Sequence, residues 1–441
     1  MTFAPKHFAI ATLCLAAFQT HAGSVEILGA PDNWGITGLS AQGQTGVMWS
    51  GAFGQIATPG NYIVNADRTP QYIGGASGYY GYVGGLSMSL DGRYISGQVE
   101  VNSQYSQAAL YDRNTGNWTA LGALSNASGF ANSTTGIKPQ STANNLSADG
   151  STVVGVSYVP NGTGSTGHAV VFRNGVVTDL TPTVTSFSTA QAVSGDGSVI
   201  SGYINNNTNN TRIWRWNDST SSYSTVINPT ATDPWTGTTG INVRVDALSR
   251  NGLWGAGGSV NNLAVNFSPP FSFPTNTYSQ ATITNALTGE SSVIPFDHVI
   301  DTSAGSKDIV RNMKTTVTGV SDSGTVIGAF TECLGCSVGT VETDAWIYFA
   351  STGVSLSIDN YLAAVGLGLS PTQHVYNVFA MSADGDSLSG FMFDKATSTT
   401  SGIIIHGITA VAAVPEPGQW ALIALGLPLL MVRRLRNRRA D

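Results

Sequence analysis

The sequence predicts an all-β fold built from repeated units of short strands. The first reason is composition: Gly, Ser, Thr and Asn dominate the 441 residues, with 52 glycines and only 10% charged residues, so helix-forming Lys, Glu and Arg are scarce. The second is a short phrase, Ser-x-x-Gly between two apolar runs, that returns seven times along the chain. Apolar residues reach 41%, too many for a disordered chain.

The repeated phrase is a hairpin signal. In its fullest form, Ser-x-Asp-Gly, an Asp-Gly turn joins two short apolar runs. The full copies are Ser89–Gly92, Ser147–Gly150, Ser194–Gly197 and Ser382–Gly385, and the looser ones are Ser40–Gly43, Ser249–Gly252 and Ser321–Gly324. Asp supplies local hydrogen bonds and Gly supplies a positive φ. We therefore interpret Asp91, Asp149, Asp196 and Asp384 as turn formers.

The unit from Thr142 to Thr181 shows what lies between two such turns. We expect strands over 143–147, 152–156, 168–172 and 176–180, with a loop over 158–167. In the fifth unit we expect the third strand over 263–267, and in the sixth unit the fourth strand over 353–358. Four short antiparallel strands per unit are the composition of a propeller blade. Seven units thus predict a seven-bladed β-propeller, with an eight-bladed ring, an irregular six-bladed ring and two β-sandwiches as alternatives.

The seventh unit ends after its third strand, near Ala410. Residues 24–29 read as a fourth strand that has no unit of its own. Pairing this segment with the seventh unit would close the ring and remove two exposed sheet edges. We therefore expect residues 23–410 to form one closed propeller.

The two ends of the chain differ from its body. Residues 1–22 predict a signal peptide, with Lys6 before an apolar stretch and small residues before the cleavage point at Ala22. At the other end a linker over 411–419 precedes an apolar helix and an Arg-rich tail over 420–441. Such a helix would span a membrane, and the arginines would mark its cytoplasmic side. The linker triplet is Pro415, Glu416 and Pro417, and the arginines are Arg433, Arg434, Arg436, Arg438 and Arg439.

This three-part C-terminus resembles the PEP-CTERM sorting signal of Gram-negative bacteria. The resemblance implies processing by an exosortase near Pro415–Pro417, with transient anchoring in the inner membrane and a final place on the outer surface or in the extracellular matrix. It also implies a link with exopolysaccharide. The units of the body resemble HAF-type extracellular repeats, through His168–Phe172, Ala192–Gly197 and Ala345-Trp346. That second resemblance implies no activity.

No group of residues predicts catalysis, a metal site or a cofactor. Cys333 and Cys336 lack the further ligands that structural zinc needs, and in an exported protein they predict a local disulfide. The histidines of the body fall in different units, and we interpret them as structural: His168, His298, His374 and His406. Carboxylates that could serve glycoside hydrolysis, with no pair singled out, are Glu100, Glu290, Glu332 and Glu342.

Charge and aromatic residues narrow the choice of partner. Residues 23–414 carry 13 basic and 24 acidic side chains, a net charge near −11, which argues against nucleic acid. Trp34, Trp49 and Trp235 lie in polar loops, where exposed rings would suit sugars. We expect a non-catalytic structural or adhesive protein of an exopolysaccharide matrix. The alternative is a propeller-type glycosidase or lyase, which would need carboxylates, His or Arg converging in the central channel.

Overall fold

A computed structural model describes most of the body of the chain. The described residues are 23–28, 35–50, 60–75, 86–130, 137–162, 164–204, 210–227, 229–232, 239–258, 280–295, 314–333, 341–382 and 384–411. The predicted signal peptide and residues 412–441, with the Pro-Glu-Pro triplet and the Arg cluster, lie outside these ranges. Within them, no helix has the length and apolar character needed to span a membrane.

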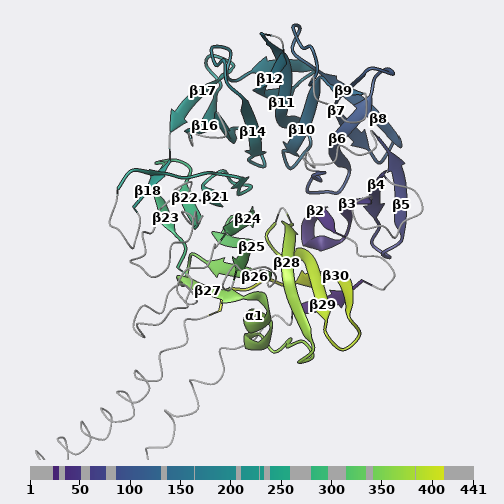
Figure 1. The fold of residues 1–441 in the computed structure, drawn as a ribbon, viewed down its shortest axis with the longest axis vertical. Helices are drawn as coiled ribbons and strands as arrows, with labels where there is room; N and C mark the ends of the chain where they lie inside the picture. Colours follow the sequence, from purple (N-terminus) through teal and green to yellow (C-terminus); the bar gives the residue numbers. More distant parts are fainter. Residues whose placement is uncertain are drawn as a thin grey trace, which may run out of the picture.

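The strands form a ring of seven four-stranded sheets, the blades, around a central axis (Figure 1). Blades 1 to 3 contain β2 (Ile36–Leu39), β3 (Gly46–Ser50), β4 (Gly60–Val64) and β5 (Pro70–Gly74); β6 (Tyr94–Glu100), β7 (Tyr105–Asp112), β8 (Asn117–Gly122) and β9 (Lys138–Pro139); and β10 (Ser141–Leu146), β11 (Thr152–Asn161), β12 (Gly164–Arg173) and β13 (Val176–Asp179). In blade 2 the innermost strand is reduced to the bridge between Met88 and Ile95, and β9 pairs in parallel with β7.

The remaining blades follow the same plan. Blades 4 to 7 contain β14 (Ser188–Val193), β15 (Val199–Ile204), β16 (Asn210–Asn217) and β17 (Ser222–Ile227); β20 (Ala247–Leu248), β21 (Trp254–Gly258), β22 (Ala281–Asn285) and β23 (Ser291–Val293); β24 (Lys314–Val320), β25 (Thr325–Cys333), β26 (Val341–Phe349) and β27 (Val354–Ser357); and β28 (Gln373–Met381), β29 (Leu388–Asp394), β30 (Thr399–His406) and β1 (Ser24–Ile27). A two-stranded sheet, β18 (Thr230–Ala231) and β19 (Ile241–Asn242), lies between blades 4 and 5 in the chain, and helix α1 (Ile358–Ala364) follows β27.

The seven-bladed prediction is confirmed, and three of its details are wrong. The expected loop over 158–167 is paired strand, because β11 and β12 continue in register as far as Asn161 opposite Gly164. The third strand of blade 5 is β22, whereas residues 263–267 lie outside the described ranges. The predicted strand through Ile358 gives way to α1 at that residue, since Ser357 caps the helix by accepting a hydrogen bond from the Asn360 amide.

The ring is closed by the N-terminal strand, as the sequence predicts. β1 pairs antiparallel with β30, with Val25 opposite Ile405 and Ile27 opposite Ile403. Blade 7 therefore takes three strands from the end of the described chain and one from its beginning (Figure 1). Because β1 pairs with β30, the edge of β30 is not left exposed, and blade 7 has four strands like the other blades.

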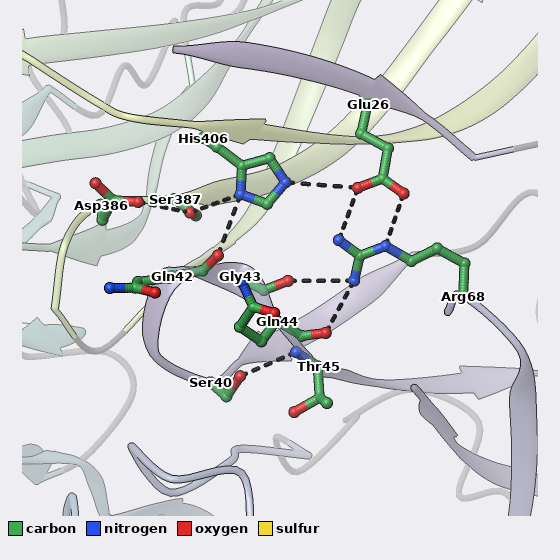
Figure 2. A network of polar contacts seen from close by, with 10 residues as sticks. All are labelled: Glu26, Ser40, Gln42, Gly43, Gln44, Thr45, Arg68, Asp386, Ser387 and His406. Atoms are coloured by element: carbon green, nitrogen blue, oxygen red, sulfur yellow. Dashed lines mark hydrogen bonds and ion pairs between the residues drawn. The ribbon is translucent and has the colours of Figure 1, made fainter. Parts of the chain in front are cut away.

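A polar network, the closure network, ties β1 to blade 1 (Figure 2). Arg68 clamps Glu26 of β1 with two hydrogen bonds of 2.7 Å, from Nε to Oε1 and from Nη2 to Oε2. Its third nitrogen, Nη1, donates to the carbonyls of Gly43 and Gln44 at 3.2 and 3.1 Å. The Arg68 hydrogen bond, opposed by partial burial, holds the pKa of Glu26 below its usual value.

His406 joins the same network from β30. Its Nδ1 lies 3.1 Å from the carbonyl oxygen of Gln42 and 3.0 Å from Oγ of Ser387. Its Nε2 lies 3.5 Å from Oε2 of Glu26. These contacts connect β30 to β1 and to the first turn of blade 1 at the junction of blades 7 and 1.

The hydrophobic core is divided among the interfaces between blades. Buried clusters of described residues lie between each pair of neighbouring blades, from Val47 and Ile95 between blades 1 and 2 to Leu28 and Ile404 between blades 7 and 1. Both faces of a blade are therefore covered, and its middle strands read as continuous apolar runs, as in β12. Trp214 and Trp346 are completely buried in two of these interfaces.

Candidate functional site

The candidate site is the axial channel, a cavity of about 190 Å³. Described residues of all seven blades line it, from β2, the segment 86–88, β10, β20, β24, β28 and the end of β14 with their turns. Every blade contributes residues of its innermost segment to this lining. The side chains of these segments therefore decide what the channel can bind.

β-Bulges set the side chains of the innermost strands. In four blades the innermost strand contains one extra residue relative to its neighbouring strand. This residue is Thr37 in β2, Asn144 in β10, Gln191 in β14 and Thr318 in β24. A bulge gives one extra residue and turns its side chain away from the regular pleat. Thr37, Asn144 and Thr318 line the channel. Asn144 also donates from Nδ2 to the Ala190 carbonyl of the next blade at 2.7 Å.

Three of the four bulges, at Asn144, Gln191 and Thr318, require a glycine on the neighbouring strand, whereas Met48 holds that position beside the bulge at Thr37. A Cβ at Gly155 of β11 would collide with the carbonyl oxygen of Thr142, and one at Gly202 of β15 would collide with that of Thr189. Gly328 stands in the same position against Thr316. At these three positions, the glycine that follows the Ser-x-x-Gly turn is explained by a backbone that approaches too closely for any side chain.

We expect Gly155→Ala to lower the free energy of unfolding by roughly 3 kcal/mol, because the methyl group must displace the β10 backbone. Gly164→Ala is the matched control, since the nearest atom to its added Cβ is 3.8 Å away and its φ is ordinary. Urea denaturation of both variants measures the difference. Equal stability of the two would contradict the close approach of Gly155 to β10.

The Ser-x-Asp-Gly turns surround one mouth of the channel. In the turn at Ser147 the hydroxyl donates to Asp149 Oδ1 at 2.7 Å and accepts from the Thr152 amide at 3.0 Å, while the Asp149 carboxylate accepts from the Ser151 amide. Although burial alone would raise the pKa of Asp149, these donors hold it below its usual value. Equivalent Ser-to-Asp bonds of 2.6 Å occur at Asp91, Asp196 and Asp384, which confirms all four as turn formers.

Hydrogen bonds also connect one turn to the next. The backbone bonds are Ala41 N to Leu90 O, Leu90 N to Ala148 O, Ala148 N to Gly195 O and Gly195 N to Arg250 O, at 2.7–2.9 Å. Two carboxylates extend the series, since Asp322 accepts from the Asn251 amide at 2.7 Å and Asp384 accepts from the Gln42 amide at 2.9 Å. Among the described residues these bonds link six of the seven pairs of neighbouring turns, and the linked turns form the rim of the channel, here called the turn ring.

The channel lining is polar and almost uncharged. Its described polar side chains are Thr37, Ser87, Asn144, Asn145, Thr318, Ser382 and Arg250. Arg250 is the one charged residue among them, and neither a carboxylate nor an imidazole appears in the described lining. The channel therefore offers hydroxyl and amide groups for hydrogen bonding and a single cation.

The three described histidines, His168, His374 and His406, lie away from this lining and have partners of their own. His168 contacts Asp179 at 2.8 Å within blade 3. His374 of β28 lies between two carboxylates, with Nε2 2.7 Å from Asp344 Oδ1 and Nδ1 2.5 Å from Asp359 Oδ2. The hydrogen bond to Asp344, followed by that to Asp359, raises the pKa of His374 to about 10. His374 is therefore a charged tie between blade 6, α1 and blade 7.

Of the other described sequence candidates, the structure brings together only the backbones of Glu332 and Glu342, outside the channel lining. Glu100 ends β6 of blade 2, and Glu290 precedes β23 of blade 5. The backbones of Glu332 and Glu342 are paired between β25 and β26. His298, Cys336, Trp34, Trp235 and the side chains of Cys333 and Trp49 lie outside what the structure describes, so the disulfide stays a prediction. The sequence analysis missed Arg250. The available signal was its place as the second residue of a Ser-x-x-Gly turn, where three other turns have the small residues Ala41, Ala148 and Gly195.

Comparison with known proteins adds similarity of fold alone. No protein-family model and no curated protein matches the sequence. Among solved structures, TolB from Acinetobacter baumannii is 16% identical with a TM-score of 0.36, over 59% of this chain and 53% of that one. A prolyl endopeptidase is 10% identical with a TM-score of 0.47, over 88% of this chain and 51% of that one. The chain thus spans about half the length of these two proteins.

A third match is the β-propeller domain of the Trilobed protease from Pyrococcus furiosus, 10% identical with a TM-score of 0.47, over 90% of this chain and 97% of that one. At these identities and scores none of the matches carries an argument about activity. The assignment rests on the strand pairing of the chain itself. On that basis the chain is a closed seven-bladed β-propeller of four-stranded antiparallel blades.

Proposed function

We propose that this protein is an exported, surface-associated structural or adhesive component of an exopolysaccharide matrix and acts without catalysis. The observation that carries the proposal is that hydroxyl and amide side chains from five of the seven blades line the channel. Such groups hydrogen-bond sugar hydroxyls, and a rigid rim holds them in place without loss of entropy on binding. Export and attachment come from the sequence signals at the two ends.

The chemistry of the lining disfavours the enzyme alternative. Glycoside hydrolysis generally needs two carboxyl groups placed on either side of the bond that breaks. The described channel residues include no carboxylate, and the aspartates of the turn ring already accept hydrogen bonds from their own turns. A sugar in this channel would find binding partners and no acid–base pair.

Sorting completes the proposal. An exosortase-type enzyme would process the chain near Pro415–Pro417, after the apolar helix and the arginines had held it in the inner membrane. The first strand of the ring begins directly after the predicted signal-peptide cleavage point, so export would leave a short N-terminus already positioned in blade 7.

Retention on the exopolysaccharide of the producing bacterium tests this function. We expect the exported protein to be retained and the polymer to keep its length, as followed by size-exclusion chromatography. Thr318→Val removes a hydroxyl from the channel and should weaken retention by roughly threefold, whereas Thr119→Val on the exposed face of β8 should not. Shortened chains would overturn the non-catalytic assignment, and lack of retention would overturn the adhesive one.

A further inference from the structure

The single charged side chain of the channel lining lies at its rim. Arg250 is the second residue of the turn Ser249–Gly252, and its carbonyl accepts the hydrogen bond from Gly195 in the turn ring. The side chain passes directly over Gly195, where a Cβ would collide with Cγ of the arginine. Gly195 thus provides the space that holds Arg250 against the rim.

The guanidinium of Arg250 is only loosely engaged. Its Nε lies 3.5 Å from Oδ2 of Asp322, and no described group bonds to its two Nη atoms. Charge-assisted hydrogen bonds normally measure about 2.7–2.9 Å. Arg68 and Arg93 show that geometry in this protein, each with two bonds to one carboxylate at 2.7–2.9 Å. Arg250 keeps the donors with which arginine binds a second carboxylate.

Neutral hydrogen-bonding groups face the same cavity. Asn145 accepts through Oδ1 from Ser87 and from the Leu146 amide, and no described group bonds to its Nδ2. Asn144 donates through Nδ2, and no described group donates to its Oδ1. At about 30 Å³ per water molecule, 190 Å³ holds roughly six waters, which is the space of one sugar ring.

We propose that the channel binds one uronic-acid unit, with its carboxylate on Arg250 and its hydroxyls on the amides of Asn144 and Asn145. The proposal rests on the proposed function, because it names the class of polysaccharide that the matrix protein recognises. The net charge near −11 repels an extended polyanion at long range. Recognition of a single unit inside the rim, within a Debye length of Arg250, avoids most of that repulsion.

Binding of D-glucuronate and D-glucose to the purified protein, measured by calorimetry, tests the proposal. We expect glucuronate to bind at least tenfold more tightly than glucose, since a hydrogen-bonded charge contributes about 1.5–3 kcal/mol. Arg250→Gln should remove this preference. Equal binding of the two sugars, or an unchanged preference in Arg250→Gln, would overturn the proposal.

Asp322→Asn provides a second variant in which Arg250 is retained. It removes the carboxylate that competes with the ligand, so the affinity for glucuronate should rise about threefold. A fall in affinity would contradict the assignment of Arg250 as the contact. The uronic-acid unit could be the end of a polysaccharide chain or a free sugar acid, and a short oligouronide distinguishes the two. Tighter binding of the oligouronide than of the monosaccharide indicates a chain end, and equal binding indicates a free sugar acid.

The outcomes separate this inference from the proposed function. If the matrix polymer is retained while glucuronate and glucose bind equally, the adhesive function stands and the role of Arg250 fails. If glucuronate binds through Arg250 while the polymer is not retained, the site stands and the adhesive function fails.

Discussion

Removal of residues 23–28 is expected to open the ring and to lower the free energy of unfolding by roughly 4 kcal/mol or more. The deletion strips blade 7 of its fourth strand and leaves the β30 edge at Ile403–Ile405 without its partner. It also takes Leu28 out of the interface between blades 7 and 1 and leaves Arg68 without the carboxylate that it clamps. Urea denaturation measures the loss, and hydrogen exchange at Ile403–Ile405 reports the opened edge.

Two neighbouring residues of this segment make a matched pair. Leu28 is 3% exposed and Ile27 is 46% exposed. Leu28→Ala should therefore cost about 2–4 kcal/mol, whereas Ile27→Ala should cost less than about 1 kcal/mol. Similar costs for the two variants, or unchanged exchange at β30 in the deletion, would show that β1 does not hold the ring closed.

The closure network should also respond to acid. The pKa of Glu26 lies below its unfolded value because of Arg68, so its contribution to stability is present above that unfolded value and is lost as the pH falls through the folded one. Glu26→Gln removes the charge and should abolish this part of the acid dependence, which the same denaturation series measures.

His374 is expected to make stability depend on pH in the opposite direction. Its pKa rises from 6.5 to about 10 in the folded protein because of Asp344 and Asp359. A raised folded value means that the folded state binds the proton more tightly. The stabilisation is therefore complete below about pH 6.5 and is lost progressively as the pH rises to about 10.

His374→Asn is the variant that measures this effect. Near pH 6 we expect it to lower the free energy of unfolding by about 2 kcal/mol, a figure reduced for solvent screening because the three side chains are each about one-third exposed. The difference from the parent protein should shrink towards pH 10. In Asp344→Asn the stabilisation should be lost at lower pH than in the parent. A difference that stays constant with pH would exclude titration of His374 as its cause.

The fold was accessible from the sequence because its signals are local and repeated. A Ser-x-Asp-Gly turn satisfies its own hydroxyl, carboxylate and amides within five residues, as Ser147, Asp149 and Thr152 show. The seven copies of this turn also predict the number of blades. The strand at residues 24–29, which belongs to none of the seven units, predicts how the ring closes. Strands 158–161 and 164–167 were missed because their Gly, Asn and Ser content is typical of loops, whereas the pairing of one strand with the other decided their conformation.

The candidate site shows the limit of that reasoning. Arg250 could be named as a turn residue from the sequence, but its place on the channel rim depends on Gly195 in the preceding blade and Asp322 in the following one. His374, Asp344 and Asp359 likewise come from β28, β26 and α1. In the closure network, Glu26 and His406 are 380 positions apart in the chain.

The sequence by itself determined the turns and the blade count, since each of these depends on hydrogen bonds and apolar runs within one unit. It also indicated the closing strand, because residues 24–29 read as a strand without a unit of its own. The tertiary structure alone decided which side chains face the channel and which charges meet. Those contacts join different blades, and their geometry is set by the bulges in the inner strands and by closure of the ring, which no stretch of sequence contains on its own.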